Sequence, residues 1–204
     1  MGQISVKIPG QFSVTINRRA PNLNSPQTAL QSGIGLVARD RTAESVAMSL
    51  TIRENTFINP AAVGRKLFSF MSPRDETALA EHIGSEVALA PNDQSMTIES
   101  LSGGNQQKVV IGRWLETKRE LLICEDPTAG VDVGAKAEIY ALLNTAIEDG
   151  VGIVVVSTDF EEVAAICHRA IVFSQGKIAG ELSGTELTTE NLIQVASASN
   201  VATN

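Results

Sequence analysis

The chain has 204 residues, of which 43% are hydrophobic, and its formal net charge at pH 7 is −7. This length and composition fit one generous folded domain, or a domain with a subdomain, and argue against a largely disordered chain. The acidic balance argues against a broad electrostatic surface for nucleic acid or anionic lipid.

The N-terminal part of the chain is rich in β signals and contains one helix signal. The stretch QISVKIPGQFSVTI alternates apolar and polar residues around a Pro-Gly pair, which predicts two short strands joined by a turn. The stretch SPQTALQSG predicts a short helix, with Ser25 as N-cap, Pro26 at the first helical position and Gly33 as the stop. A strand over 34–38, IGLVA, is predicted to follow.

From Arg39 to about Ser100 the β signal disappears, and a second Ser-Pro helix start at Ser72 opens a segment with helical spacing. This part is a candidate helical subdomain. After it, the predicted elements alternate as helix 104–116, strand ELLIC, helix 135–148, strand GIVVV, a helix from near Asp159 and strand AIVFS. Three almost wholly apolar strands separated by amphipathic helices predict a parallel sheet covered on both faces.

The apolar segments do not predict a membrane span or a disulfide. The longest apolar runs, such as IVVV at 153–156, are far shorter than the ~20 residues that cross a bilayer. Cys124 and Cys167 lie in apolar segments away from any CxxC pattern, which favours two buried thiols in a reducing compartment over a disulfide or metal site. His82 and His168 lie outside every motif below, and we interpret both as structural.

The stretch LSGGNQQK, residues 101–108, places Ser102 as an N-cap before two glycines and a helix. Free N–H groups and the helix dipole both favour negative charge at such a helix start, so the geometry suits an anion. Taken alone, this pattern is better explained as an ordinary helix cap.

The stretch LLICEDPTAGVD, residues 121–132, is an apolar strand that runs into Glu125 and Asp126 and then a loop ending in Asp132. The carboxyl ends of parallel strands are where an α/β sheet presents groups to a ligand, and Mg²⁺ prefers carboxylate oxygens. A polar strand cap would explain this motif alone, but it does not explain both motifs together. The usual phosphate cradle, G-x-x-x-x-G-K-[ST], is absent from the sequence.

The order LSGGNQQK, LLICEDPTAGVD, VVVSTDFEEV and AIVFSQGKI resembles that of the ATP-binding subunit of an ABC transporter. The Asn in SGGNQQK, with SPQTALQSGIGLVARDR and SLTIREN upstream, narrows the resemblance to the tandem-cassette subunits of bacterial monosaccharide importers of the ribose and xylose type. The resemblance covers nearly the whole chain. It implies an α/β, P-loop NTPase-like cassette with a mainly parallel sheet, and specifically the second, C-terminal cassette without its Walker A phosphate loop.

The expected organisation has three parts. Residues 1–38 would form a partial β-rich subdomain, residues 39–103 an inserted helical subdomain that ends at the signature motif, and residues 104–204 the α/β core with the Walker B-like strand and the C-terminal tail.

The resemblance also implies a role for each matching residue. In that family the signature motif contacts the γ-phosphate of ATP held by the opposing cassette, and the matching residues here are Ser102, Gly103, Gly104, Asn105 and Gln106. Asp132 matches the loop that crosses the cassette interface. The segment Leu50–Asn55 resembles the part that faces the membrane subunit.

Several positions depart from the family pattern. Glu125 and Asp126 stand in the reverse order of the family's Asp-Glu pair, which would displace each carboxylate by roughly 1.5 Å. A misplacement near 1 Å can cost ~10²-fold in rate. Thr158 replaces the switch histidine, and Arg39 stands where the Q-loop glutamine would fall. We therefore treat Glu125, Asp126 and Thr158 as degenerate catalytic positions, with Glu125 as the candidate Mg²⁺ ligand.

The function implied is that of an ATP-binding and ATP-hydrolysing component of an ABC sugar importer, which supplies the LSGGN half of an interfacial ATP site and uses ATP and Mg²⁺. The expected partners are another cassette, namely the first of the same subunit, the membrane permease subunits and, indirectly, a periplasmic sugar-binding protein, without nucleic acid. The expected location is the cytoplasmic face of the bacterial inner membrane, as a peripheral protein. Without a phosphate-loop lysine, the isolated chain is predicted not to hydrolyse ATP.

Two other functions compete with this one. The chain could be a non-catalytic truncated cassette that acts as an interaction module on a full cassette or a membrane subunit. An ABC-type ATPase that acts on ribosomes or DNA fits less well, because such partners favour basic patches and this chain is acidic.

Overall fold

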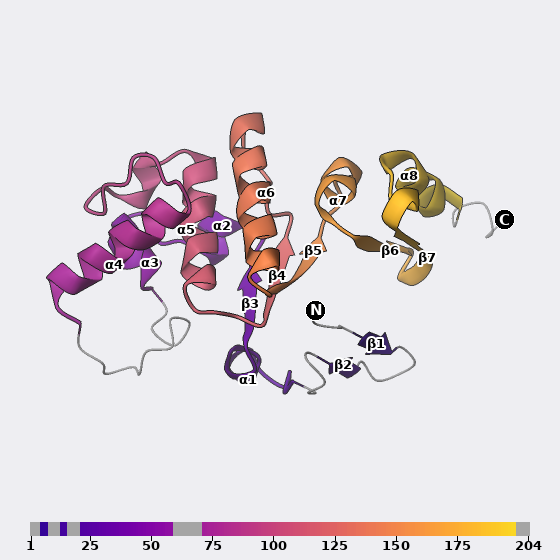
Figure 1. The fold of residues 1–204 in the computed structure, drawn as a ribbon, viewed down its shortest axis with the longest axis horizontal. Coiled ribbons are helices and arrows are strands. Elements are labelled where there is room, and N and C mark those ends of the chain that lie inside the picture. The colour runs from indigo at the N-terminus through magenta and orange to yellow at the C-terminus, as the bar shows by residue number, and fades with distance from the viewer. Residues whose placement is uncertain (1–4, 8–12, 16–20, 59–70, 199–204) are drawn as a thin grey trace. The chain divides into compact units, whose positions relative to one another are not determined.

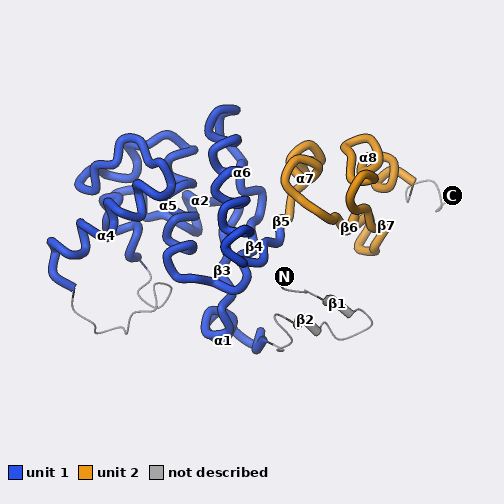
Figure 2. The backbone as a smooth tube through the Cα atoms, viewed as in Figure 1, with its two compact units in different colours: residues 1–154 blue, residues 155–204 orange. Residues whose placement is uncertain are grey.

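The computed structural model describes residues 5–7, 13–15, 21–58 and 71–198. The chain divides into two compact units, residues 1–154 and residues 155–204 (Figure 2). The three-part organisation expected from the sequence follows other boundaries and stays a prediction. The elements in chain order are β1 (Ser5–Lys7), β2 (Ser13–Thr15), α1 (Pro26–Gln31), β3 (Ile34–Val37), α2 (Arg41–Glu44), α3 (Ile52–Thr56), α4 (Pro73–Glu86), η1 (Ile98–Ser100), α5 (Gly103–Leu115), β4 (Leu121–Glu125), α6 (Val133–Glu148), β5 (Gly152–Val156), α7 (Phe160–Ile166), β6 (Arg169–Ser174), β7 (Lys177–Ser183), η2 (Gly184–Glu186) and α8 (Thr189–Ala198) (Figure 1).

The first strands form a small antiparallel pair. β1 runs against β2 with Val6 opposite Val14, as the alternation of apolar and polar residues predicts. The predicted turn at Pro9 and Gly10 lies outside the described residues.

A three-stranded sheet has the order β3-β4-β5. β3 pairs parallel to β4, with Ile34 opposite Leu121 and Val37 opposite Cys124. At the start of β5, the N–H of Gly152 donates to the carbonyl oxygen of Glu120 at 2.9 Å. The predicted α/β class with parallel pairing is therefore confirmed.

Helix α5 is the central helix of the first unit. It packs against α3, α4 and α6 (Figure 1), and most of its residues from Gln106 to Trp114 are buried. The core around it contains side chains that are almost completely buried, among them Ile98, Ile111, Leu122, Ile139 and Leu143. A helix buried on nearly every side is held by tertiary packing more than by its own helix propensity.

Side-chain caps at the N-termini explain where several helices begin. The N-cap side chains accept a hydrogen bond from a backbone N–H in the first turn, which satisfies a donor that the helix itself leaves unpaired. These caps are Ser25 for α1, Ser72 for α4, Ser102 for α5, Asp132 for α6 and Asp159 for α7. The predicted Ser-Pro helix starts are confirmed.

The second unit contains α7, the β6–β7 hairpin and α8, whose apolar side chains pack around Val172, Leu187 and Leu192. The sequence predicted β6 as a third strand of a parallel sheet with β4 and β5, and the parallel direction is wrong for the pairing that the structure describes. β6 pairs antiparallel with β7 in a separate two-stranded sheet. The reason is local, because Gln175 and Gly176 adopt φ values of 50° and 74°, the conformation of a tight two-residue hairpin turn.

Cys124 and Cys167 are not joined in a disulfide. Cys124 is fully buried in β4, as predicted, whereas Cys167 after α7 is only half-buried. Burial raises the pKa of the Cys167 thiol, and the nearby charge of Glu162 adds to that rise. Separately, the helices of the described segments are each too short or too polar to cross a membrane.

Candidate nucleotide-facing site

The start of α5 has the geometry that the LSGGNQQK motif predicts. Ser102 is the N-cap, with φ −60° and ψ 156°, and its hydroxyl accepts from the N–H of Asn105 at 3.4 Å. The Ser102 side chain is exposed, whereas Gly104 is buried. The first-turn amides of this 13-residue helix therefore face a turn that has little side-chain bulk, which suits an anionic ligand.

Both glycines of the turn are needed for close packing. A Cβ on Gly103 would lie 2.5 Å from Nη2 of Arg41 and 2.9 Å from the carbonyl oxygen of Gly130. A Cβ on Gly104 would overlap the Cβ of Ala135 in α6. The signature turn, residues 101–104, is thus packed against both the loop before α6 and the start of α6.

The next residues of the motif fasten α5 to its surroundings. Asn105 accepts through Oδ1 from the N–H of Ala90 at 3.1 Å and donates through Nδ2 to the Ser102 hydroxyl at 3.1 Å. Gln106 is only 5% exposed, and its Nε2 donates to the carbonyl oxygens of Ile98 and Leu101 at 3.2 and 3.1 Å. The side chain of Gln106 is therefore placed to position the turn and not to touch a ligand directly.

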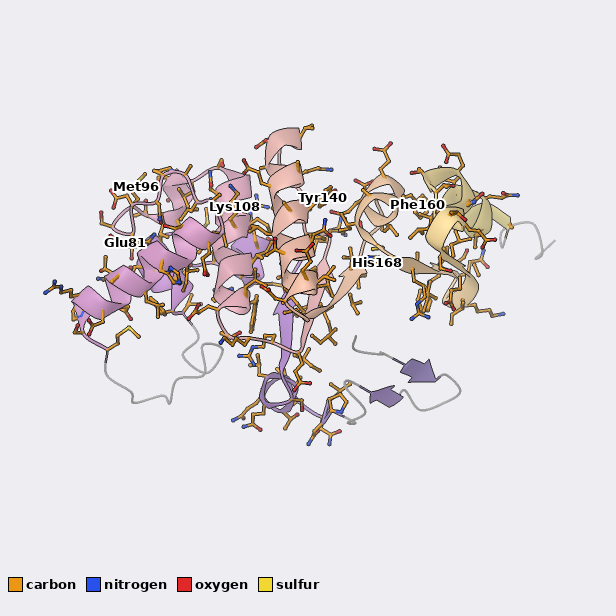
Figure 3. The ribbon with its side chains drawn as sticks, viewed as in Figure 1. Glu81, Met96, Lys108, Tyr140, Phe160 and His168 are labelled. Atoms are coloured by element: carbon orange, nitrogen blue, oxygen red, sulfur yellow. The ribbon has the colours of Figure 1, made fainter. Side chains whose placement is uncertain are left out.

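Lys108 is a buried cation that the sequence motif contains but to which we assigned no role. Its side chain is 4% exposed, and Nζ donates to the carbonyl oxygen of Ala88 at 2.8 Å and forms an ion pair with Glu138 of α6. It lies on α5, one helix away from Tyr140 of α6 (Figure 3). The ion pair joins the two helices that flank the signature turn.

The acidic strand end carries an unexpected partner. β4 ends at Glu125, and Asp126 follows with φ 41°, a left-handed conformation that Asp tolerates better than most residues. Oδ2 of Asp126 lies 3.2 Å from Nε of Arg39. The residue that stands at the expected Q-loop position thus forms an ion pair with the candidate catalytic carboxylate.

The end of β4 offers few side chains that could bind a metal ion. In the described ranges, no three His, Cys, Asp or Glu side chains gather closely enough to hold a metal ion. Mg²⁺ is commonly bound through one or two carboxylates, with phosphate and water oxygens as the other ligands. Glu125 therefore fits Mg²⁺ only as part of a nucleotide complex.

Asp132 and the loop before it are built into α6. The Asp132 carboxylate caps α6 by accepting from the N–H of Ala135 at 3.0 Å, and the loop contains Gly130 with φ 65°. Next to the cap, Val133 is 85% exposed. The cap accounts for the presence of an Asp here and leaves the loop surface accessible.

Thr158 belongs to the second unit, whereas the other predicted site residues belong to the first. It is exposed between β5 and α7, and the next residue, Asp159, caps α7. His82 is an exposed residue of α4, with Nε2 3.4 Å from Glu86 Oε1. His168 is exposed before β6 (Figure 3).

The segment Leu50–Asn55 contains the start of α3. Thr51 and Glu54 form a reciprocal capping box, and Asn55 is fully buried, with its amide nitrogen donating to the carbonyl oxygens of Ala47 and Thr51 at 3.0 Å each. Arg113 of α5 donates to the carbonyl oxygen of Asn55 at 3.1 Å, and burial lowers the pKa of Arg113 to about 10. The segment is thus rigidly fixed to α5.

A residue that the sequence motifs did not single out lies at the centre of the site. Arg41, the first residue of α2, donates through Nε to Oε1 of Gln106 at 3.2 Å and through Nη1 to the carbonyl oxygen of Ala129 at 2.9 Å. These partners are 65 and 88 residues away in the sequence. No local pattern could have predicted such contacts.

Comparison with known proteins places these features in a family context. The family model described as ABC transporter matches residues 6–129. The ribose import ATP-binding protein RbsA 3 of Rhizobium meliloti (strain 1021) is 37% identical over 181 residues, which cover 89% of this chain and 36% of that protein. The ribose import ATP-binding protein RbsA of Lactococcus lactis subsp. cremoris (strain SK11) is 35% identical over 184 residues, covering 90% of this chain and 37% of that protein. The chain therefore spans little more than a third of the length of these relatives.

Solved structures share the fold. A nucleotide-free ATP-binding cassette from an ABC transporter superposes with a TM-score of 0.73 at 19% identity, covering 96% of this chain and 78% of that one. A dimeric bacterial ABC transporter cassette superposes with a TM-score of 0.67 at 25% identity, covering 87% of this chain and 75% of that one.

Proposed function

The chain belongs to the ABC transporter family and has the α/β fold of its P-loop NTPase-like cassettes, and from this premise we propose that it works as the ATP-binding component of a sugar importer. We assign to it the half of a composite ATP site that is built on LSGGN at 101–105. The observation that carries the proposal is the start of α5, where an exposed Ser102 caps a 13-residue helix whose first two residues are glycines.

The chemistry of that helix start suits a phosphate group. The amide donors of the first turn and the positive end of the helix dipole both stabilise negative charge, and the Ser102 hydroxyl adds a donor on the exposed side. ATP supplies the phosphoanhydride bond whose hydrolysis would drive transport. The residues of this chain fit one side of a triphosphate, because the sequence lacks the phosphate-loop lysine that would hold the other side.

We assign a weaker role to the carboxylates of this chain's own strand end. Arg39 holds a positive charge 3.2 Å from Oδ2 of Asp126, where a catalytic carboxylate would need to reach water, and the order Glu125-Asp126 is the reverse of the family's. Glu125 would be the Mg²⁺ ligand of this degenerate half, and the metal would supply positive charge for the phosphates. The proposal is an asymmetric pair of sites in which this chain serves the partner's nucleotide.

The partner in this proposal is the first cassette of the same subunit, and this chain is the second, C-terminal cassette without a Walker A sequence. The names of the relatives support sugar import, and ribose is the first sugar to test. The proposed assembly includes membrane permease subunits and a periplasmic sugar-binding protein, with the cassettes at the cytoplasmic face of the inner membrane. A non-catalytic interaction module is less favoured, because the relatives are ATP-binding proteins for import.

The test of this function is uptake of radiolabelled ribose into proteoliposomes that hold the complete transporter with this chain and ATP on the cassette side. The expected result is uptake that requires ATP and stops when a non-hydrolysable analogue replaces it. Absence of ATP-dependent uptake of ribose and of other pentoses and hexoses would contradict the assignment.

A further inference from the structure

Arg41 joins three segments that surround the signature turn. It is the first residue of α2, and its guanidinium donates to Oε1 of Gln106 at 3.2 Å and to the carbonyl oxygen of Ala129 at 2.9 Å. Gln106 belongs to the second turn of α5, whereas Ala129 belongs to the loop between β4 and α6. One side chain therefore connects the start of α2, the helix α5 and the loop that ends at Asp132.

The guanidinium of Arg41 also lies beside Gly103, the first glycine of the motif. A Cβ on Gly103 would lie 2.5 Å from Nη2 of Arg41, so a side chain at position 103 would force the guanidinium to shift. The position of Arg41 thus helps to explain why residue 103 is a glycine, which helix capping alone does not explain. Arg41 is half-buried here, and both of its hydrogen-bond acceptors are neutral oxygens.

Gln106 extends the connection into the segment before the turn. It accepts from Arg41 and donates to the carbonyl oxygens of Ile98 and Leu101 at 3.2 and 3.1 Å. A continuous chain of hydrogen bonds thus runs from η1 through Gln106 and Arg41 to Ala129. Since a guanidinium is planar and holds its donors in a fixed fork, it sets the angle between its two acceptors, which a flexible lysine does not do.

We propose that Arg41 is a positioning residue that holds the signature turn and the loop 129–132 in a single arrangement, so that both are presented together to the nucleotide of the partner cassette. This inference rests on the proposed function of residues 102–106. Arg41 acts through Gln106, Gly103 and Ala129 and does not itself touch the reacting atoms. Its loss therefore affects turnover more than the binding of ATP, most of which depends on the partner's phosphate loop.

The test compares Arg41→Ala with Arg119→Ala in the complete transporter that contains this chain. Arg119 is a matched control, because it also donates to one side-chain oxygen, that of Thr117 at 2.8 Å, and to one carbonyl oxygen, that of Leu30 at 2.8 Å. These contacts involve α1 and the segment before β4. Each variant removes one such pair of hydrogen bonds, and Arg119→Ala also removes the contact of Arg119 with the Trp114 ring, at 5.5 Å from its centroid.

For Arg41→Ala we expect kcat for ATP hydrolysis to fall roughly 10- to 100-fold, with KM for ATP changed less than about threefold, since small misplacements act on the chemical step. For Arg119→Ala we expect kcat within about threefold of the wild type, even if its melting temperature falls as much as that of Arg41→Ala. Arg41→Lys should not restore kcat. The loss in the double variant Arg41→Ala with Gln106→Ala should be smaller than the sum of the two separate losses, because both changes break the same bond between the two side chains.

Equal kcat values for Arg41→Ala and Arg119→Ala, full rescue by Arg41→Lys, or additive losses with Gln106→Ala would overturn the inference. If the wild-type assembly hydrolyses no ATP, the proposed function fails, and amide hydrogen exchange decides the positioning role separately. Arg41→Ala should then accelerate exchange of the hydrogen-bonded amides of both Gln106 and Ala129 by at least about tenfold. The exchange rates report how often each amide opens to solvent. Unchanged exchange at either amide would refute the connection.

Discussion

At the scale of single residues, Lys108 and Glu138 form an ion pair in which the two side chains differ in burial. The Lys108 side chain is 4% exposed, whereas that of Glu138 is 56% exposed. An ammonium group that is removed from water needs its partner more than a carboxylate that still faces water. The two residues are therefore not equivalent targets for mutation.

We predict that Glu138→Gln destabilises the protein more than Lys108→Met does. Glu138→Gln removes the negative charge beside the buried ammonium and leaves it only neutral oxygen acceptors, such as the Ala88 carbonyl, which should cost about 1–3 kcal/mol. Lys108→Met removes the charge together with its desolvation and should cost less than about 1.5 kcal/mol. Urea unfolding followed by the fluorescence of Trp114, the single tryptophan, measures both. Glu148→Gln, an exposed change on the same helix, should stay within about 0.5 kcal/mol, and a cost for Lys108→Met above that of Glu138→Gln would contradict this account.

At the scale of elements, helix contacts in the first unit depend on glycines with no room for a side chain. A Cβ on Gly112 of α5 would lie 2.9 Å from Cγ1 of Val87 and 3.0 Å from Cγ2 of Ile83, at the end of α4. A Cβ on Gly134 of α6 would meet only Oδ1 of Asp132, at 3.4 Å. An alanine side chain would therefore be crowded at position 112 of α5 but would have space at position 134 of α6.

The prediction is that Gly112→Ala destabilises the protein and Gly134→Ala does not. Ala gains about 0.5–1 kcal/mol over Gly within a helix, but overpacking at Gly112 should cost about 1–3 kcal/mol and outweigh that gain. At Gly134 only the gain remains, and it should be at most about 1 kcal/mol. The same urea unfolding assay measures both variants. A stabilised Gly112→Ala variant would show that α4 and α5 are not packed as closely as described.

Elements whose signals are local in sequence were predictable. The Ser-Pro starts of α1 and α4 and the Asp159 cap of α7 each use partners within three residues, so a reading of the sequence contains the whole cause. Strand β7 was not predicted, because the two-residue turn at Gln175 lacks the usual Asn-Gly or Asp-Gly pair. Whether β6 pairs in a parallel or an antiparallel direction cannot be decided from its apolar residues alone.

The candidate site shows the same division between local and distant causes. The cap by Ser102 and the glycines after it follow from the motif itself. The contacts of Arg41 with Gln106 and of Arg39 with Asp126 join residues 65 and 87 positions apart. Such contacts arise from strand order and chain topology, so the residue types alone could not predict them.

At the scale of the whole molecule, the second unit exposes an apolar patch on the β6–β7 hairpin. The patch consists of Ile171, Phe173 and Ile178, which are 36%, 62% and 50% exposed. Phe173 lies opposite Ile178 in the hairpin register. Clustered apolar side chains on a surface favour association, whereas single ones do not.

We predict that the purified chain self-associates through this patch. Light scattering should give a mass above that of the monomer for the wild type and a lower mass for Phe173→Lys, because the new charge disfavours burial of the patch. Leu23→Lys is the matched control, since Leu23 is a separate residue with 49% exposure, and it should leave the mass unchanged. A wild-type chain that is monomeric across the concentration range would show that the patch does not drive association.

The measurement that tests the central claim most directly is the ATPase rate of the complete transporter with Ser102→Arg or with Asp126→Asn in this chain. If the signature turn serves the partner's nucleotide, the bulky side chain at Ser102 should lower the rate by roughly 100-fold or more, as the loss of a donor to a developing charge does. Asp126→Asn should keep the rate within about threefold of the wild type, because Arg39 already pairs with that carboxylate. Equal damage by the two substitutions would contradict the asymmetric pair and would make Glu125-Asp126 a working variant of the acidic pair.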